Sequence, residues 1–322
     1  MKRLMLWELV VLAVLLIATF VTLVTFPNPK ISPSASGKPT LPTGPQPTEP
    51  FIPTWNTYPD DRQLLAKQYF VYDSKANTFL LSSGQPTTKV YPASITKLFT
   101  AYVAMQHLHP STKITAGDAL DFVVPGSSVA KIKRGDVLTV EQLVEAMLLP
   151  SGNDAAYILA CAAGRAVKND SALSAGAAYK AFVDQMNAQA ISLGMTGTHF
   201  VNPDGIHDPN HYSTFGDLAI LGKLALENET ILKYATKSKD QVTLHGQTIE
   251  WKNTNKLIDP RHSYYCPHAL GLKTGQTPDA GSCLLSAFRY EGKELIIGVF
   301  GCPEEEDRFD DTLQLFNQIV LK

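Results

Sequence analysis

Two spacings of apolar residues divide the chain between strands and helices. Short runs rich in Tyr, Phe, Val and Leu, bounded by Gly, Asn or Ser, are typical of strands. They occur near the start of the globular part and again near its end. The last two of these runs are joined by a turn at Glu291-Gly292. Strands are therefore expected at 69–72, 78–81, 271–275, 281–290 and 293–301.

The middle of the chain has helical spacing. A helix is expected to begin near Ser94, and others at 153–166 and 178–193. Thr139 with Gln142 three positions later is a capping box, which predicts another helix start. The remaining predicted features are a helix start at Thr214 with Asp217, and a closing helix with Phe309, Leu313, Phe316 and Val320 on one stripe.

This order of elements predicts the fold class. Strands come first, helices follow, and three strands and a helix close the chain. One antiparallel sheet with helices packed on it satisfies that order, so we expect an α+β architecture.

The first 59 residues differ from the rest. Residues 9–26 carry no charge, and a run of this length is in the range of about 17–25 residues that spans a membrane. Lys2 and Arg3 would keep the amino end in the cytoplasm. We expect an uncleaved anchor at 1–27, with a cleaved signal at the small-x-small site 34–36, and hence a secreted protein, as the alternative.

A proline-rich segment follows. Residues 28–59 have Pro every few positions with Ser, Thr and Gly between, a composition that cannot bury a core. Such a linker extends by about 3.1 Å per residue. The globular domain is therefore expected at 60–322, held away from the bilayer.

Charge and cysteine content exclude several classes of protein. The formal net charge is −2 and no basic block occurs, so no nucleic-acid partner is expected. There is no C-x-x-C pair and no Cys/His metal spacing. Buried thiols are expected, with one disulfide left open, at Cys161, Cys266, Cys283 and Cys302.

Candidate chemistry begins at Ser94. Residues three apart on a helix share a face, so Ser94 and Lys97 in "YPASITKLFTAY" can meet without tertiary help. The helix N-terminus could stabilise an oxyanion, and burial could lower the pKa of the lysine until it serves as a base. Taken alone, the pattern is weak, because a serine that caps a helix looks the same. A second S-x-x-K, Ser128 to Lys131, has no helix start and is interpreted as chance.

Two further motifs favour the catalytic interpretation. Ser151-Gly152-Asn153 lies between two predicted helices, and Lys273-Thr274-Gly275 lies on a predicted strand. The three motifs in this order are the signature of penicillin-binding proteins and class A β-lactamases.

With these motifs the chain resembles the serine D-alanyl-D-alanine carboxypeptidases, the low-molecular-mass penicillin-binding proteins. Residues 186–222 resemble that family's segment between its second and third motifs, and the likeness covers about 60–322. The resemblance implies a penicillin-binding protein or β-lactamase fold. In that fold, N- and C-terminal helices pack on the antiparallel sheet and a helical subdomain completes it.

The resemblance also implies a role for each motif residue. Ser94 would be the acylated nucleophile, Lys97 its base, and Ser151 the relay of a proton to the leaving amine. The backbone N–H groups of Ser94 and Gln276 would form the oxyanion hole. The implied substrate-binding residues are Asn153, Lys273, Thr274, Gly275, Gln276 and, as a weaker candidate with a solvated arginine as its alternative, Arg308.

Other functions are less well supported. A class A β-lactamase needs a deacylating glutamate in a loop, and Glu227, Glu229 and Glu250 lie in helix-end or strand-like contexts. A non-catalytic peptidoglycan-binding protein would have no need of the base. No G-x-S-x-G elbow supports a Ser-His-Asp hydrolase. His207 and His211 have zinc-ligand spacing but fall in a Pro/Gly loop.

The expected function is therefore a membrane-tethered carboxypeptidase of the cell wall. It would trim peptidoglycan pentapeptide stems through an acyl-enzyme on Ser94, with β-lactam antibiotics as inhibitors and with no metal or organic cofactor. Many family members carry a further C-terminal domain and an anchoring helix. Here the sequence stops at Lys322, so attachment is expected at the N-terminus.

Overall fold

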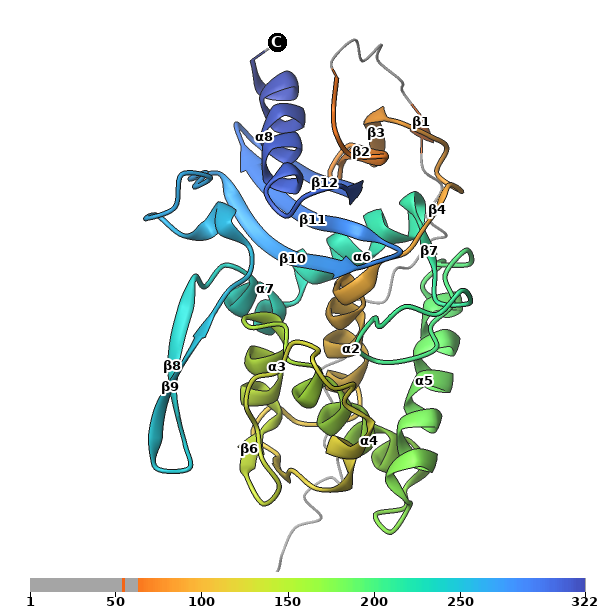
Figure 1. The fold of residues 1–322 in the computed structure, drawn as a ribbon. Coiled ribbons are helices and arrows are strands. Elements are labelled where there is room, and N and C mark those ends of the chain that lie inside the picture. The colour runs from red at the N-terminus through yellow and green to blue at the C-terminus, as the bar shows by residue number, and fades with distance from the viewer. Residues whose placement is uncertain (1–53, 56–62, 322) are drawn as a thin grey trace, which may run out of the picture. The chain divides into compact units, whose positions relative to one another are not determined.

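The computed structural model describes residues 54–55 and 63–321. Five antiparallel strands form its main sheet, and the two-residue strand β1 pairs in parallel with the edge strand β3. Across the sheet the order is β1-β3-β2-β12-β11-β10 (Figure 1). The strands are β1 (Thr54–Trp55), β2 (Gln68–Asp73), β3 (Thr78–Ser82), β10 (Ala269–Thr277), β11 (Gly281–Tyr290) and β12 (Lys293–Cys302).

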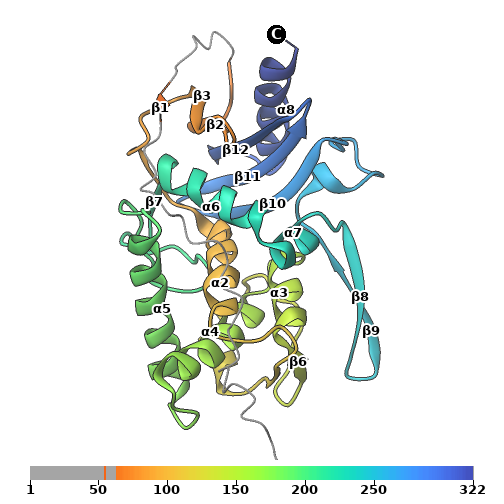
Figure 2. The same cartoon turned by 180° about the vertical axis from the view of Figure 1, so that it is seen from behind.

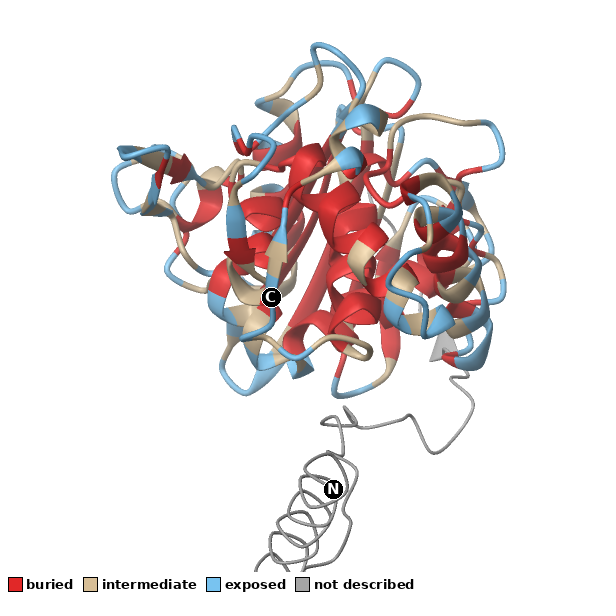
Figure 3. Ribbon diagram, turned by 90° about the horizontal axis from the view of Figure 1, so that it is seen from below, coloured by how far each residue is buried: buried red, intermediate tan, exposed pale blue. Residues whose placement is uncertain are grey.

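The two faces of the sheet enter different cores, because successive side chains of a strand point to opposite sides. On β11, Leu284 and Phe288 pack toward one core, whereas Leu285 and Ala287 pack toward the other. The first core is closed by the helix α8 (Asp307–Val320) through Phe309 and other apolar residues. Buried residues fill the sheet and the helix faces turned toward it (Figure 3).

Helices cover the other face of the sheet and extend away from it (Figure 2). The helix α6 packs against β11 and β12, and α2 continues from the short turn η1, which touches β10. These elements are η1 (Ala93–Ile95), α2 (Thr96–Met105), α3 (Val140–Leu148), α4 (Asn153–Lys168), α5 (Ala175–Ser192), α6 (Phe215–Glu227) and α7 (Glu229–Ala235).

Smaller elements connect them. Two-stranded pairs are formed by β4 with β7, β5 with β6, and β8 with β9. Their bounds, with those of the two remaining 3₁₀ turns, are β4 (Lys89–Val90), β5 (Lys113–Thr115), η2 (Asp118–Phe122), β6 (Val137–Thr139), β7 (Ser213–Thr214), β8 (Lys239–Leu244), β9 (Gln247–Lys252) and η3 (Lys256–Ile258).

The predicted strands and helix starts are confirmed at most places. The side chains of Thr139 and Gln142 form the expected capping box, and Thr214 accepts a hydrogen bond from the N–H of Asp217. The helix expected near Ser94 begins as the 3₁₀ turn η1 before α2 continues it. The β8–β9 hairpin was not predicted, since its strands are polar and largely exposed.

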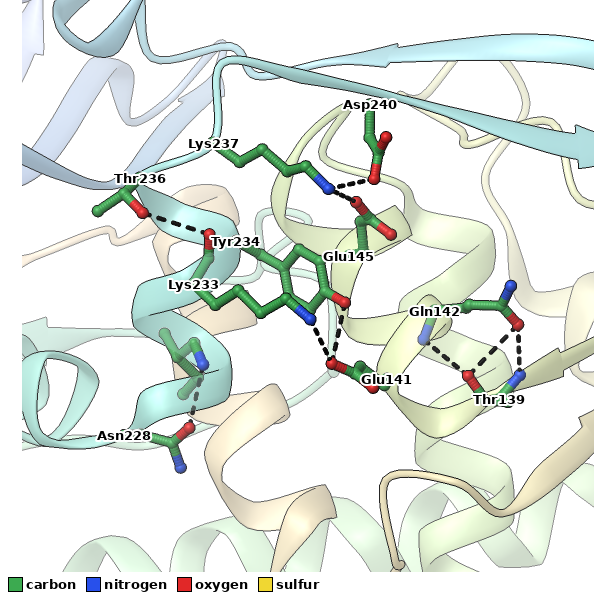
Figure 4. Close-up of polar contacts among 11 residues, drawn as sticks. Thr139, Glu141, Gln142, Glu145, Asn228, Lys233, Tyr234, Thr236, Lys237 and Asp240 are labelled. Carbon is green, nitrogen blue, oxygen red and sulfur yellow. Dashed lines mark hydrogen bonds and ion pairs between the residues drawn. The ribbon is translucent and has the colours of Figure 1, made fainter.

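Polar contacts tie α3 to α7 and to the hairpin (Figure 4). Glu141 accepts hydrogen bonds from Lys233 at 2.8 Å and from the Tyr234 hydroxyl at 3.1 Å. Lys237 lies between Glu145 and Asp240. Because α3 leads directly to Ser151, these contacts brace one wall of the site described below.

Some expectations fall on other parts of the chain. The predicted anchor at 1–27 and nearly all of the linker at 28–59 lie outside the described residues. Within the described residues, no helix is long and apolar enough to cross a membrane. The four cysteines are all buried and free, so the disulfide left open by the sequence is not formed.

Candidate active site

The first motif brings two side chains into contact. Ser94 lies in η1 and Lys97 in the first turn of α2, and the Lys97 Nζ lies 2.7 Å from the Ser94 Oγ. The same Nζ donates a hydrogen bond to the Asp204 carbonyl at 2.6 Å. Lys97 is fully buried, and Ser94 is half-buried. One helical turn therefore places the Ser94 hydroxyl in contact with the Lys97 amine, and the Asp204 carbonyl fixes that amine by a second hydrogen bond.

The protonation of Lys97 is set by its surroundings. Burial lowers the pKa of Lys97 to about 8, and the nearby carboxylates of Asp204 and Asp154 limit that fall. Burial penalises the charged ammonium because it removes water from around it. A substantial neutral fraction is therefore present near pH 8, and a neutral amine can accept the Ser94 proton.

The second motif lies at the N-terminus of α4. Ser151 is buried and has a φ of 62°, in the left-handed region. Asn153 is also buried, and no described residue hydrogen-bonds to its side-chain oxygen. The Asn153 amide oxygen can therefore accept a hydrogen bond from a molecule that enters the site.

The segment around the second S-x-x-K supports this turn. The Ser128 carbonyl accepts the Asn153 N–H at 2.8 Å. The backbone N–H groups of Ala130 and Ile132 donate to the Asp154 carboxylate at 2.9 and 3.0 Å. Ser128 is not at a helix start, in agreement with its interpretation as a chance match. The segment instead fixes the start of α4.

The third motif lies on β10, the last strand of the sheet. Lys273 is buried, and its Nζ donates to the Thr274 carbonyl at 3.0 Å. Burial lowers the pKa of Lys273 well below its usual value, and the positive charges of Lys97 and Arg308 lower it further. The Thr274 Oγ1 lies 2.5 Å from the Thr254 Oγ1, which orients the threonine hydroxyl.

Two glycines let the backbone close around Ser94. A Cβ on Gly275 would lie 2.8 Å from the Pro92 carbonyl oxygen and 3.2 Å from the Ser94 nitrogen. A Cβ on Gly205 would lie only 1.9 Å from the Ala93 carbonyl oxygen. Because neither glycine has a Cβ, the backbone of β10 and the backbone of the 202–211 loop pack directly against the Ala93–Ser94 peptide.

Each motif also contains or follows a residue in the left-handed region. Ala93 precedes Ser94 with a φ of 47°, Ser151 has this conformation itself, and Leu272 precedes Lys273 with a φ of 84°. Such conformations cost about 1–3 kcal/mol each and concentrate at functional sites. Three of them converge here.

The comparisons with known proteins agree with this geometry. A family model described as D-alanyl-D-alanine carboxypeptidase matches residues 55–304. The chain belongs to the serine-type D-alanyl-D-alanine carboxypeptidase family.

Individual carboxypeptidases resemble the chain over most of its length. It is 36% identical to the D-alanyl-D-alanine carboxypeptidase of a Streptomyces strain over 71% of this chain and 79% of that one. DacF of Bacillus subtilis is 30% identical over 68% of this chain, but the match spans only 53% of DacF.

Solved structures show the same fold. A Streptomyces DD-transpeptidase superposes with a TM-score of 0.70 at 31% identity, over 80% of this chain and 98% of that one. Penicillin binding protein 5 from Haemophilus influenzae has a TM-score of 0.67 at 26% identity, over 81% and 72% of the two chains. The expected fold class is thereby confirmed.

Arg308 lies beside the third motif of this carboxypeptidase-family chain. Only 3% of it is exposed, and its guanidinium donates to the Gly275 carbonyl at 3.3 Å and to Glu305 at 2.8 Å. The alternative of a solvated arginine is therefore wrong. Gln276, one residue further along β10, is exposed at the strand end.

The two histidines of the 202–211 loop contact Tyr91 and Thr96, which flank Ser94. The His211 Nδ1 accepts the Val201 N–H at 3.2 Å and its Nε2 lies 2.8 Å from the Thr96 Oγ1. Burial lowers the pKa of His211 to about 4, so it is neutral and tethers the loop to α2. No group of three metal-ligating side chains occurs among the described residues, and the zinc interpretation gains no support.

The glutamates weighed for a β-lactamase lie in other elements than the motif residues. Glu227 ends α6, Glu229 begins α7, and Glu250 lies in β9, where it pairs with Lys239 at 2.7 Å. In the described part of the chain, none of the three hydrogen-bonds to Ser94 or Lys97.

Sequence reasoning missed Asp204 and Gly205. Both lie in the turn that begins at Asn202, whose side chain accepts the Gly205 N–H at 2.7 Å. The Asn-Pro-Asp-Gly run signals a turn. Nothing local indicates that this turn passes against Ser94 and Lys97.

Gly205→Ala is expected to destabilise the fold and to displace Ser94. Its φ of +85° disfavours a side chain by about 1–2 kcal/mol, and overpacking against Ala93 adds about 1–3 kcal/mol. Gly194→Ala is the matched control, since its φ is +83° and nothing lies within 4 Å of the added Cβ. Denaturant unfolding and the rate of penicillin acylation measure both effects. Equal losses in the two variants would contradict the close approach at Ser94.

Proposed function

We propose that the chain is a D-alanyl-D-alanine carboxypeptidase that trims peptidoglycan stem peptides through an acyl-enzyme on Ser94. The observation that carries the proposal is the 2.7 Å contact between Ser94 and the buried Lys97, beside the edge strand that bears Lys273 and Thr274. Family membership supports the same reaction class.

The steps follow from the placement of the groups. Neutral Lys97 accepts the Ser94 proton, and the Ser94 Oγ attacks the carbonyl between the two terminal D-alanines. The N–H groups of Ser94 and Gln276 stabilise the oxyanion. Ser151 passes a proton to the leaving amine, D-alanine departs, and water then releases the shortened stem.

Three residues hold the substrate in this proposal. Thr274 and the charge of Arg308 receive the terminal carboxylate, while Asn153 binds the peptide amide. Lys273, whose pKa is lowered by burial, adds positive charge to the site when it is protonated. The same site accepts β-lactams as inhibitors, because an acyl-serine that hydrolyses slowly traps the drug.

Transpeptidation is the second candidate, favoured by the structural likeness to a DD-transpeptidase. The chemistry is shared until the acyl-enzyme forms, after which an amine instead of water accepts the acyl group. Adding glycine or a stem-peptide amine during turnover distinguishes the two, because a transpeptidase converts acyl-enzyme to the new amide.

We also propose that residues 9–26 anchor the protein in the cell membrane, with the catalytic domain outside the cytoplasm. Their uncharged length and the two cationic residues before them support this placement. Fractionation of expressing cells with an antibody to the domain tests it, and release of the domain into the medium would indicate a cleaved signal instead.

The reaction itself is tested on the detergent-solubilised full chain. Intact-mass spectrometry before and after benzylpenicillin, with peptide mapping, is expected to show a stable adduct on Ser94, together with D-alanine release from a D-Ala-D-Ala peptide. Rapid loss of penicillin without an adduct would favour a β-lactamase. Intact penicillin without an adduct or D-alanine release would favour a non-catalytic binder.

The acylation rate is expected to rise with pH across about pH 8, because Lys97 acts only when neutral. Asp204→Asn removes a carboxylate that raises the pKa of Lys97, so the rising limb moves to lower pH. Asp184→Asn, on the exposed face of α5, is the control. If the acylation rate of Asp204→Asn rises over the same pH range as that of the wild type, the Asp204 carboxylate does not influence the pKa of Lys97.

A further inference from the structure

The proposed function sets the direction in which a stem peptide crosses the site. Its terminal carboxylate lies at Thr274 and the attacked carbonyl lies near Ser94 and Gln276. The earlier stem residues must then continue past Gln276 toward the turn at 278–280. Because β10 is the last strand of the sheet, an extended peptide can pair with its edge. A peptide that runs from the 278–280 turn toward Thr274 is antiparallel to β10.

A cavity opens at that end of β10. It has a volume of about 600 Å³ and is formed by the turn after β10, the end of β12, the start of β2, β4 and the 209–212 segment. Tyr91, which lines it, precedes Ser94 by three residues, so the cavity adjoins the site without including Ser94. The lining residues used below are Lys67, Lys89, Tyr91, Tyr212 and Asp279.

The reach of the peptide matches this position. An added strand advances one residue for each residue of β10, at about 3.3 Å each. If the acylated D-alanine lies level with Gln276, the residue two before it lies level with Pro278, next to Asp279 at the cavity rim. Gln276 to Pro278 line a separate shallow hollow, and Asp279 is the first residue of this turn to line the cavity, so a side group that extends past Pro278 reaches the cavity rim.

The charge of the cavity favours an anion. Lys67 and Lys89 both line it, and neither has an ion-pair partner within the described residues. Among the described residues of the lining, Asp279 is the single carboxylate, and it lies 3.7 Å from the His207 Nε2. Two cations against one carboxylate leave a net positive charge.

Lys89 is also held in place. Its Nζ lies 3.8 Å from the centre of the Tyr212 ring, a cation–π contact, and its backbone carbonyl accepts the Gln68 side chain at 3.2 Å. Across the cavity mouth, Tyr91 contacts the His207 ring at 4.7 Å and remains 38% exposed. The cavity therefore offers an oriented cation and an aromatic face to an entering peptide.

We propose that this cavity is a specificity subsite for the amino-side part of the stem peptide. In it, Lys89 binds a free carboxylate carried by the residue two positions before the acylated D-alanine. The chain then discriminates between stems in which that carboxylate is free and stems in which it is an amide. The inference rests on the proposed carboxypeptidase function.

Two synthetic pentapeptides ending in D-Ala-D-Ala test the subsite on the solubilised full chain. In one, the second residue is a γ-linked D-glutamate with a free α-carboxylate, and in the other it is the α-amide. We expect kcat/KM for D-alanine release to be about two- to fivefold higher for the free acid at low salt, as for an exposed charge pair. The preference should shrink as salt increases.

Variants assign the preference to Lys89. Lys89→Gln is expected to reduce the ratio of the two kcat/KM values to about one, and Lys89→Glu to reverse it. Lys293→Gln, an exposed lysine at the β11–β12 turn, is the matched control and should keep the wild-type ratio. Thermal unfolding of each variant shows that the fold is retained.

Two results would overturn the subsite: a ratio of one in the wild type, or an unchanged ratio in both Lys89 variants. If neither peptide releases D-alanine and benzylpenicillin forms no adduct on Ser94, the proposed function fails and the subsite with it. A penicillin adduct with equal turnover of both peptides would remove the subsite alone.

Discussion

Ser94→Ala is expected to abolish both D-alanine release and the covalent penicillin adduct. In the proposed mechanism the Ser94 hydroxyl forms the acyl bond, and alanine has no group that could replace its 2.7 Å contact with the Lys97 Nζ. Removing a catalytic serine costs a factor of at least about 10⁴ in turnover. Intact-mass spectrometry with benzylpenicillin and a D-alanine assay measure the two losses separately.

Ser192→Ala is the control for this variant. Ser192 ends α5, and its hydroxyl donates a hydrogen bond to the Gln189 carbonyl at 2.8 Å. Its adduct and turnover should equal those of the wild type. If Ser94→Ala still releases D-alanine, the acyl-serine mechanism at Ser94 is wrong. If the penicillin adduct maps to another serine, that serine is the nucleophile.

Lys97→Met is expected to give the second large effect, a fall of about 10²–10⁴-fold in the acylation rate, the usual contribution of a general base. Methionine is unbranched and of similar length, so it can fill the buried site without the amine. Because the residue that titrates near pH 8 is gone, the rising limb of the pH profile should also disappear. Stopped-flow acylation by a chromogenic β-lactam across pH 6–10 (roughly the window around that pKa) measures both.

Lys180→Met, on the exposed surface of α5, serves as the control and should keep rate and profile. Thermal unfolding separates catalysis from stability. It is needed because Lys97→Met leaves the buried Asp204 carboxylate without the nearby positive charge, which costs stability. If folded Lys97→Met still shows an acylation rate that rises near pH 8, another group is responsible for that pH dependence.

The sequence determined the local parts of this protein. Ser94 and Lys97 meet because residues three apart on a helix share a face, a relation that needs no tertiary contact. The capping box of Thr139 with Gln142 formed as expected for the same reason, since both partners lie within one turn. The strands near the C-terminus also formed, because runs of apolar residues bounded by turn residues predict strands locally, and both faces of β11 and β12 are buried.

Contacts over long separations could not be predicted. Asp204 lies 107 positions from Lys97, yet its carbonyl holds the lysine amine and its carboxylate limits the fall of the Lys97 pKa. Arg308 lies in an acidic segment that the sequence alone suggests is solvated, yet its side chain is buried against Gly275. Turn signals and charge patterns describe a segment by itself, and they do not say which other segment covers it.

The sequence by itself determined the identity of the motif residues and their order along the chain. Only the tertiary structure decided their properties: the burial that lowers the pKa of Lys97, the approach of Gly205 and Gly275 to Ser94, and the cavity beside β10. The physical reason is that desolvation and close packing depend on every neighbour in space. Helical and strand periodicity record only the neighbours along the chain.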